Sequence, residues 1–138
     1  MTVPAASELR VHLPWRRQLT ARAAVGVARL LILLPPGRLR KSLKLISRGA
    51  RPAEAALALS ARQATVSVSA RCAGQGCLQR SVATAVLCRL HGQWPDWCTG
   101  VRTQPFRAHA WVEVDGVAVG EIDDMSQFHP TMTVRSAS

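Results

Sequence analysis

The sequence predicts an α+β fold in which a helix packs on a small antiparallel sheet and basic helices precede this core. Two observations predict it. Apolar residues recur every three or four positions through roughly the first 90 residues, and apolar and polar residues alternate after about residue 97. A chain of 138 residues is long enough for one domain. We expect a basic helical segment at 1–52 and a core at 53–138, forming one compact unit.

The N-terminal third predicts two helices after a loose lead at 1–14. The first spans 16–34 and stops at Pro35-Pro36-Gly37. Its apolar stripe predicts a face that is buried or contacts a partner. A shorter helix follows at 39–47 and ends before Gly49, with an apolar face opposite a basic one. The stripe of the first helix comprises Leu19, Ala23, Val27, Leu30, Leu31 and Leu34.

A third helix is predicted to begin near Pro52, because proline suits the first helical turn. In its later residues, 64–69, apolar and polar residues alternate as in a strand, so the sequence allows either a helix or a strand there. Residues 72–76 predict a loop, and the next helix begins at or beside Cys77 and is capped by Gly92. The expected inward residues of these two helices are Ala55, Leu57, Leu59, Val66, Leu78, Val82, Ala85, Val86 and Leu90.

Strands are predicted at 97–102, 106–114 and 117–121. The middle strand places Phe106, Ala108 and Ala110 on one face and His109 and Trp111 on the other. Asp115-Gly116 is a strong hairpin signal between the last two strands. Residues after about Gln127 are predicted to fray.

Charge is distributed unevenly along the chain. The 18 basic and 8 acidic residues give a net charge of +10, and residues 1–51 hold 11 of the basic residues and one acidic residue. Such a segment suits an acidic polypeptide, a nucleic acid, an anionic membrane surface or simply water. No nucleic-acid-binding motif accompanies the charge, so we expect no nucleic acid partner.

The apolar run at 23–34 is shorter than the roughly 20 residues needed to cross a bilayer, and Arg29 interrupts it. We therefore expect no membrane span and no export signal, and hence a cytoplasmic protein. Disulfides are not expected there. The spacing of Cys72, Cys77, Cys88 and Cys98 matches no zinc framework, so we expect no metal and no cofactor.

Cys77 and His109 are the chemistry-bearing pair. A thiol at a helix N-terminus has a lowered pKa, and its backbone N–H can donate to an oxyanion. An imidazole on a strand 32 residues later can take and return a proton. Gln75 is a candidate second oxyanion donor, and Trp111 either lines a substrate groove or packs. Arg80 and Ser81 are expected to brace the helix.

The imidazole needs an acid to orient it, and the hairpin decides which one. A two-residue loop at Asp115-Gly116 would place Ile122 opposite His109. A three-residue loop with a bulge at Gly116 would instead place Glu121 there. We predict the bulged hairpin and Glu121, with Asp123 as the substitute.

Several segments together closely resemble the leader peptidase of bacterial lasso-peptide biosynthesis, the separately encoded form of protein B, which is a transglutaminase-like cysteine protease. The resemblance is tight over 53–124 and looser over the N-terminal helices. It extends the layout expected above, which is that of papain-like and transglutaminase-like cores. The segments are Cys77-Leu78-Gln79-Arg80-Ser81, Arg89-Leu90-His91-Gly92, Thr99-Gly100-Val101, Pro105-Phe106-Arg107-Ala108-His109-Ala110-Trp111-Val112-Glu113 and Asp115-Gly116.

The resemblance implies a protease that removes the leader from a ribosomally made precursor peptide. Its triad would be Cys77, His109 and Glu121, where the family usually has aspartate as the third member. It also implies two partners: a small leader-recognition protein similar to the pyrroloquinoline-quinone chaperone, and an asparagine-synthetase-like cyclase that uses ATP. The alternatives are an acyltransferase of the same fold and a non-catalytic adaptor.

Overall fold

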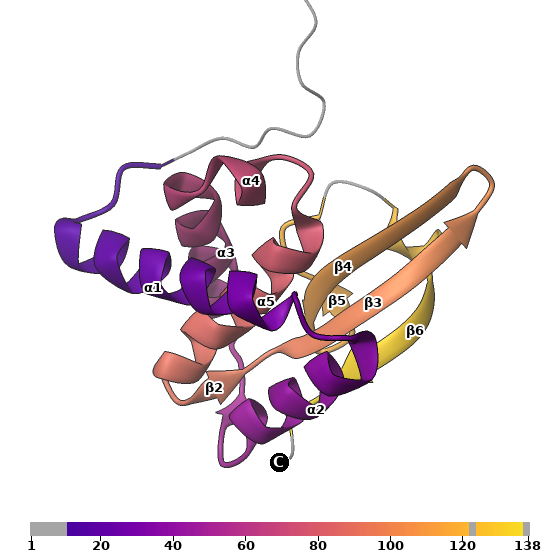
Figure 1. Cartoon of the computed structure of the whole chain (residues 1–138), viewed down its shortest axis with the longest axis horizontal. Coiled ribbons are helices and arrows are strands. Elements are labelled where there is room, and N and C mark those ends of the chain that lie inside the picture. Colours follow the sequence, from indigo (N-terminus) through magenta and orange to yellow (C-terminus); the bar gives the residue numbers. More distant parts are fainter. Residues whose placement is uncertain (1–10, 122–123, 137–138) are drawn as a thin grey trace, which may run out of the picture.

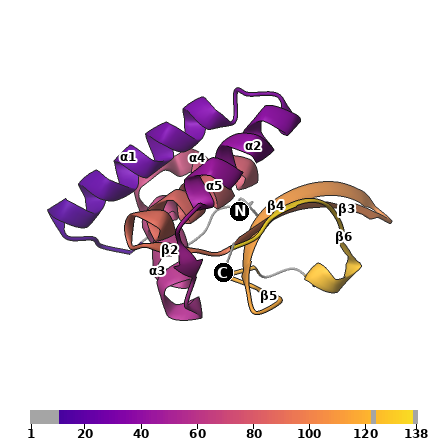
Figure 2. The same cartoon turned by 90° about the horizontal axis from the view of Figure 1, so that it is seen from below.

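A computed structural model describes residues 11–121 and 124–136. Helices lie on one side and a curved sheet on the other (Figures 1 and 2). The helices are α1 (Trp15–Leu31), α2 (Pro36–Ser47), α3 (Ala55–Val68), α4 (Ala70–Ala73) and α5 (Cys77–Leu90), with a 3-10 turn, η1 (Met125–Gln127). The strands are β1 (Arg51–Pro52), β2 (Gln93–Trp94), β3 (Asp96–Thr103), β4 (Phe106–Val114), β5 (Val117–Ala118) and β6 (His129–Val134).

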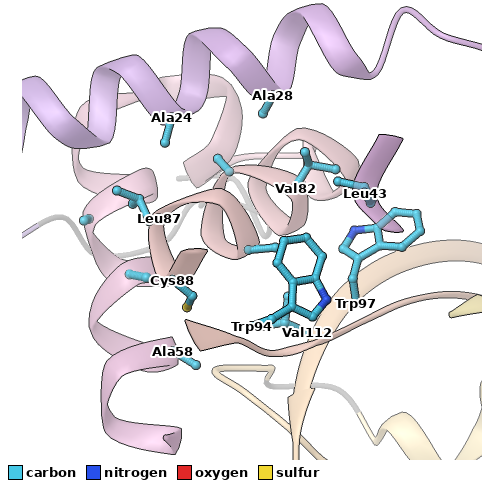
Figure 3. Close-up of a cluster of buried hydrophobic side chains, with 14 of the residues drawn as sticks. Ala24, Ala28, Leu43, Ala58, Val82, Leu87, Cys88, Trp94, Trp97 and Val112 are labelled. Carbon is cyan, nitrogen blue, oxygen red and sulfur yellow. The ribbon is translucent and has the colours of Figure 1, made fainter. Parts of the chain in front are cut away.

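Helix α5 lies at the centre of the molecule and contacts α1, α3 and β4. Alanines of α1 face it, and Figure 3 shows Ala24 and Ala28 on the side of α1 toward Val82 and Leu87 of α5. Small side chains allow two helix axes to approach closely. The main core fills the space between this helical layer and the sheet, and includes Leu43, Ala58, Cys88, Trp94, Trp97 and Val112.

The predicted inward faces of the helices are wrong in part. Leu19 and Leu30 of α1 are 58% and 69% exposed, and Leu90 of α5 is 61% exposed. In α3, Ala55 and Leu59 are also exposed. Where a helix carries both an alanine stripe and a leucine stripe, close packing selects the smaller residues, which hydrophobicity alone does not reveal.

For residues 64–69 the sequence allowed either a helix or a strand, and the structure continues α3 as far as Val68. The short helix α4 then occupies the start of the predicted loop at 72–76. Its cap is Ser69, whose side chain accepts a hydrogen bond from the Cys72 N–H at 3.2 Å. α1 ends at Leu31, three residues before its predicted end.

The sheet has the antiparallel order β5-β4-β3-β6. The prediction that residues after Gln127 fray is wrong, since β6 pairs with β3 along its other edge. Val134 is 1% exposed, and its carbonyl accepts a hydrogen bond of 3.0 Å from the indole N–H of Trp94. The buried contact between these two groups holds β6 in place. β1 and β2 form a separate parallel pair.

The predicted bulged hairpin is also wrong. Glu113 pairs with Ala118 and Val114 with Val117, which leaves a two-residue turn. Asp115 and Gly116 have φ values of +53° and +79°, as a tight turn that matches the twist of a sheet requires. Strand pairing ends after two residues of β5, so the predicted strand at 117–121 is shorter than expected. Ile122 lies outside the described residues.

Candidate active site

Cys77 is the first residue of α5, and its thiol is half-buried. The helix begins here because the Arg80 N–H bonds to the Gly76 carbonyl at 2.9 Å. Gly76 also permits a close crossing of the chain. A Cβ at this position would lie 2.7 Å from the Arg71 carbonyl oxygen, so a larger residue would displace the turn that presents the thiol.

The backbone N–H of Cys77 does not have the free position predicted for an oxyanion donor. It donates to the Gln75 carbonyl at 2.9 Å across a three-residue turn. The dihedral angles of Gly76, φ −79° and ψ 55°, are those of an inverse γ-turn. Gln75 itself is exposed at the rim of the site.

Arg80 braces the loop that precedes Cys77. Its side chain is buried, and Nη1 donates to the carbonyls of Cys72 at 2.9 Å and Gly74 at 3.2 Å. Ser81 braces α5 against the sheet, because its hydroxyl accepts from the indole N–H of Trp97 at 3.0 Å. Both contacts agree with the bracing role expected from the sequence.

His109 lies on β4 and is 5% exposed. Its Nε2 is 2.5 Å from Oε1 of Glu121, which leaves Nδ1 as the ring nitrogen for Cys77. The ring is stacked against Trp111 with centroids 6.0 Å apart and also contacts Phe128.

Trp111 is 2% exposed and its indole N–H donates to Glu113. Trp111 therefore supports the imidazole from within the protein, and the expected substrate groove does not include it.

Glu121 reaches His109 by a route that the sequence did not predict. After Val119, whose N–H bonds to the Val112 carbonyl at 2.9 Å, Gly120 takes a φ of +71° and turns the chain away from the strand. The other carboxylate oxygen, Oε2, is 3.1 Å from Nη2 of Arg62 on α3.

Arg62 was not among the site residues predicted from the sequence. The signal for it was an arginine on a helix face otherwise made of Ala58, Ala61 and Thr65. Asp123, the alternative acid, lies outside the described residues.

The electrostatics of the site favour a thiolate–imidazolium pair. Burial raises the pKa of Cys77, but a hydrogen bond and charge from His109, the Ala110 backbone and the charge of Arg80 together lower it below its ordinary value. Burial lowers the pKa of His109, but its hydrogen bonds with Cys77 and Glu121 and their charges raise it to about 9. Both shifts favour the ion pair over the neutral pair, and the thiolate is the reactive form of a cysteine nucleophile.

The carboxyl group of Glu121 is held ionised. Burial raises its pKa, but the hydrogen bond from His109 and the charges of Arg62, His109 and Arg80 lower it overall. An ionised carboxylate can orient an imidazole and stabilise its protonated form.

The remaining three cysteines differ sharply from Cys77. Burial raises the pKa of Cys72, and it raises the pKa of Cys88 and of Cys98 to about 12. These thiols stay protonated at neutral pH and pack as small apolar groups. Cys77 is the one cysteine of the four that is poised for nucleophilic chemistry.

A cleft of about 470 Å³ opens over the site. Cys77 and His109 reach it from α5 and β4, and among the described residues no carboxylate lines it. Within the described ranges, no group of three or more side chains is placed to hold a metal ion, and no helix has the length and apolar character to cross a membrane. The lining residues are Gly74, Gln75, Cys77, Arg80, Arg107, Ala108 and His109.

Comparison with known protein families identifies a superfamily. A family model described as the transglutaminase-like superfamily matches residues 21–133, which covers most of the chain. No curated protein and no solved structure matches the chain. The matched range includes α2 to α5, the sheet except for the last residue of β6, and most of α1.

Proposed function

Because the chain belongs to the transglutaminase-like superfamily, which includes cysteine proteases and acyltransferases, we propose that it is a cysteine peptidase. Its substrate would be the precursor of a lasso peptide, from which it removes the leader. One observation carries the proposal: a thiol with a lowered pKa starts α5 within an open cleft, beside an imidazole that Glu121 orients.

The reaction follows from these groups. The Cys77 thiolate attacks the carbonyl carbon at the leader–core junction and forms a C–S bond. His109, as the imidazolium, gives its proton to the leaving amine when the C–N bond breaks. The neutral imidazole then takes a proton from water, which attacks the thioester and frees the leader as a carboxylate. Glu121 stabilises the imidazolium and fixes the ring orientation.

The product of this cleavage is a core peptide with a free α-amine. An amine is the nucleophile that macrolactam closure needs, so the next step requires a ligase that activates a side-chain carboxylate. The asparagine-synthetase-like cyclase implied by the sequence resemblance has this chemistry. We propose that it takes the product of this protein directly.

We further propose that the small leader-recognition protein binds the outer face of α1. This face exposes Trp15, Leu19 and Leu30, which are 66%, 58% and 69% exposed, and Leu33 in the turn after the helix is 76% exposed. Arg22 and Arg29 are exposed on the same helix, and α1 contains no acidic residue. A partner with an apolar surface bordered by carboxylates fits both properties. Its affinity should fall steeply as salt increases, and a salt-insensitive affinity would indicate docking through the apolar residues alone.

Incubation of precursor with the protein, with and without the recognition protein, tests the proposed activity. We expect Cys77→Ala to abolish release of the leader. Cys88→Ala is the matched control, because it removes a buried thiol of raised pKa from the same helix. Mass spectrometry of the products separates the rival functions: hydrolysis gives a free leader carboxylate, and acyl transfer gives a leader amide. Unchanged function in Cys77→Ala would indicate an adaptor.

A further inference from the structure

Arg62 is a buried cation outside the three groups used above. It lies on the core-facing side of α3, and its side chain is 7% exposed. A guanidinium remains charged in proteins, and removing it from water is unfavourable by several kcal/mol unless other groups compensate it. Glu121, whose side chain is 6% exposed, provides the nearest compensating charge described.

The carboxylate of Glu121 is held between two partners. Oε1 is 2.5 Å from Nε2 of His109, and Oε2 is 3.1 Å from Nη2 of Arg62. With each oxygen engaged by a different group, the carboxylate has a fixed orientation. The three side chains come from α3, β4 and the segment after β5.

The backbone before Glu121 also rests on Arg62. A Cβ added to Gly120 would lie 2.7 Å from Cδ and 3.0 Å from Nε of the arginine. The strand pairs of β5 end at Ala118 and the Val119 N–H still bonds to the Val112 carbonyl of β4, so Gly120 and Glu121 follow the part of the chain that is bonded to the sheet. The stem of Arg62 thus supports the chain where the sheet no longer does, and its guanidinium contacts the carboxylate that follows.

We propose that Arg62 is a positioning residue for the nucleophile: it orients Glu121 toward His109 and keeps the buried carboxylate ionised. This inference rests on the catalytic roles proposed for Cys77 and His109. The charge of Arg62 also lowers the pKa of Glu121, second to the hydrogen bond from His109 among the effects that oppose burial.

Removing the guanidinium is expected to affect Glu121 first, then the imidazolium, and then the Cys77 thiolate. A buried carboxylate without its cation binds a proton more readily, so its pKa rises. A protonated Glu121 no longer stabilises the imidazolium. With less imidazolium, the Cys77 thiolate loses its main stabilising partner and forms only at a higher pH.

The test is the rate of Cys77 alkylation by iodoacetamide as a function of pH, followed by mass spectrometry of the cysteine-containing peptide. It needs no peptide substrate, so failure of the proposed leader cleavage leaves it unaffected. Arg62→Met keeps the length of the stem and removes the charge. We expect the midpoint of its thiolate titration to rise by about 1 pH unit. On cleavage of precursor, kcat should fall roughly 10- to 100-fold with KM unchanged, since Arg62 does not line the cleft.

Arg89→Met is the matched control. Arg89 also donates from its guanidinium, to the carbonyls of Ile46 at 2.8 Å and Arg48 at 3.1 Å. It lies near the opposite end of α5, about 18 Å along the helix from Cys77. We expect its alkylation midpoint to equal that of the wild type.

A double-mutant cycle shows whether Arg62 acts through Glu121. In a Glu121→Gln background, Arg62→Met should shift the midpoint no further, because the carboxylate it acts on is gone. The proposal is overturned by an unchanged midpoint in Arg62→Met, or by an equal shift in both backgrounds. If Arg62→Met does not fold, Arg62→Lys and Arg62→Gln replace it. The lysine variant should then keep the lower midpoint, and equal midpoints in the two would overturn the proposal.

Discussion

The third member of the proposed triad, Glu121, is a glutamate where the resembled family usually has aspartate, and the structure shows how the longer side chain is accommodated. Gly120 turns the chain out of the strand, and the additional methylene lets the carboxylate reach between His109 and Arg62. The glycine moves the backbone away from His109, and the longer side chain of glutamate spans the added distance.

Glu121→Gln should narrow the pH range of activity. Acylation needs the His109 imidazolium, which is present below its pKa of about 9 and is lost as pH rises through that value. An amide carries no charge, so the pKa of His109 should fall, and the basic limb of kcat/KM should move to lower pH. The acid limb should move to higher pH, because the thiolate loses imidazolium.

The pH profile of leader cleavage measures both limbs of this curve. Glu54→Gln is the control, since Glu54 is exposed and makes no side-chain cap at the start of α3. A basic limb that stays near pH 9 in Glu121→Gln would show that the carboxylate does not set the pKa of His109.

At the scale of single elements, the predictions are correct where local patterns decide the structure. The alternation of Phe106 to Val114 predicted β4 with its observed bounds, and Gly76 followed by an apolar pattern predicted the start of α5. The sheet and the α5–β4 contact followed from these patterns. The α+β fold with a helix on a small antiparallel sheet is confirmed.

The incorrect predictions concern tertiary contacts. The hairpin was expected to carry a bulge because strand parity alone would otherwise place Ile122 opposite His109. Glu121 is instead placed by Gly120, which has a left-handed backbone conformation and packs against Arg62. This contact depends on a helix about 60 residues earlier in the chain. Likewise, β6 forms because Trp94 and Val134 are buried together, and the local sequence of residues 129–134 does not show it.

Gly120→Ala and Gly116→Ala form a matched pair that separates the effect of the Gly120–Arg62 contact from that of backbone strain. Both residues have a φ near +75°, so the backbone strain of alanine should cost about 1–2 kcal/mol of unfolding free energy at each, and the contact with Arg62 adds to this cost at Gly120. A Cβ at Gly116 meets no heavy atom within 4 Å, whereas one at Gly120 meets Arg62 at 2.7 Å. We expect only Gly120→Ala to slow alkylation of Cys77.

Urea unfolding and the alkylation rate measure the two effects separately. If both variants slow alkylation equally, backbone strain and not the contact with Arg62 would be responsible.

At the scale of the whole molecule, the helices before residue 52 share the core of the segments after it. Ala24, Ala28 and Leu43 are buried in the same cluster as Val82, Trp94 and Val112. The basic side chains of α1 and α2 therefore lie on the outer surface of helices that the core requires.

One core predicts one unfolding transition. We expect helix content by far-ultraviolet circular dichroism and tryptophan fluorescence to change together in urea. The first probe reports α1 and α2 among the helices. The second reports chiefly the buried Trp94, Trp97 and Trp111 near the sheet, because Trp15, the fourth tryptophan, is 66% exposed and changes its environment least. Two separated midpoints would show that 1–52 unfolds as a unit of its own.

Gly120 makes the position of the acid independent of the length of the hairpin tip. The acid is placed after the hairpin, by a turn that rests on α3, and Asp115 and Gly116 are exposed at the tip. Residues inserted at the tip would leave Val119, Gly120 and Glu121 where they are. We therefore expect the number of residues between histidine and acid to vary among relatives. We also expect a glycine–acid pair and a buried arginine upstream to locate the third group better than its spacing from the histidine.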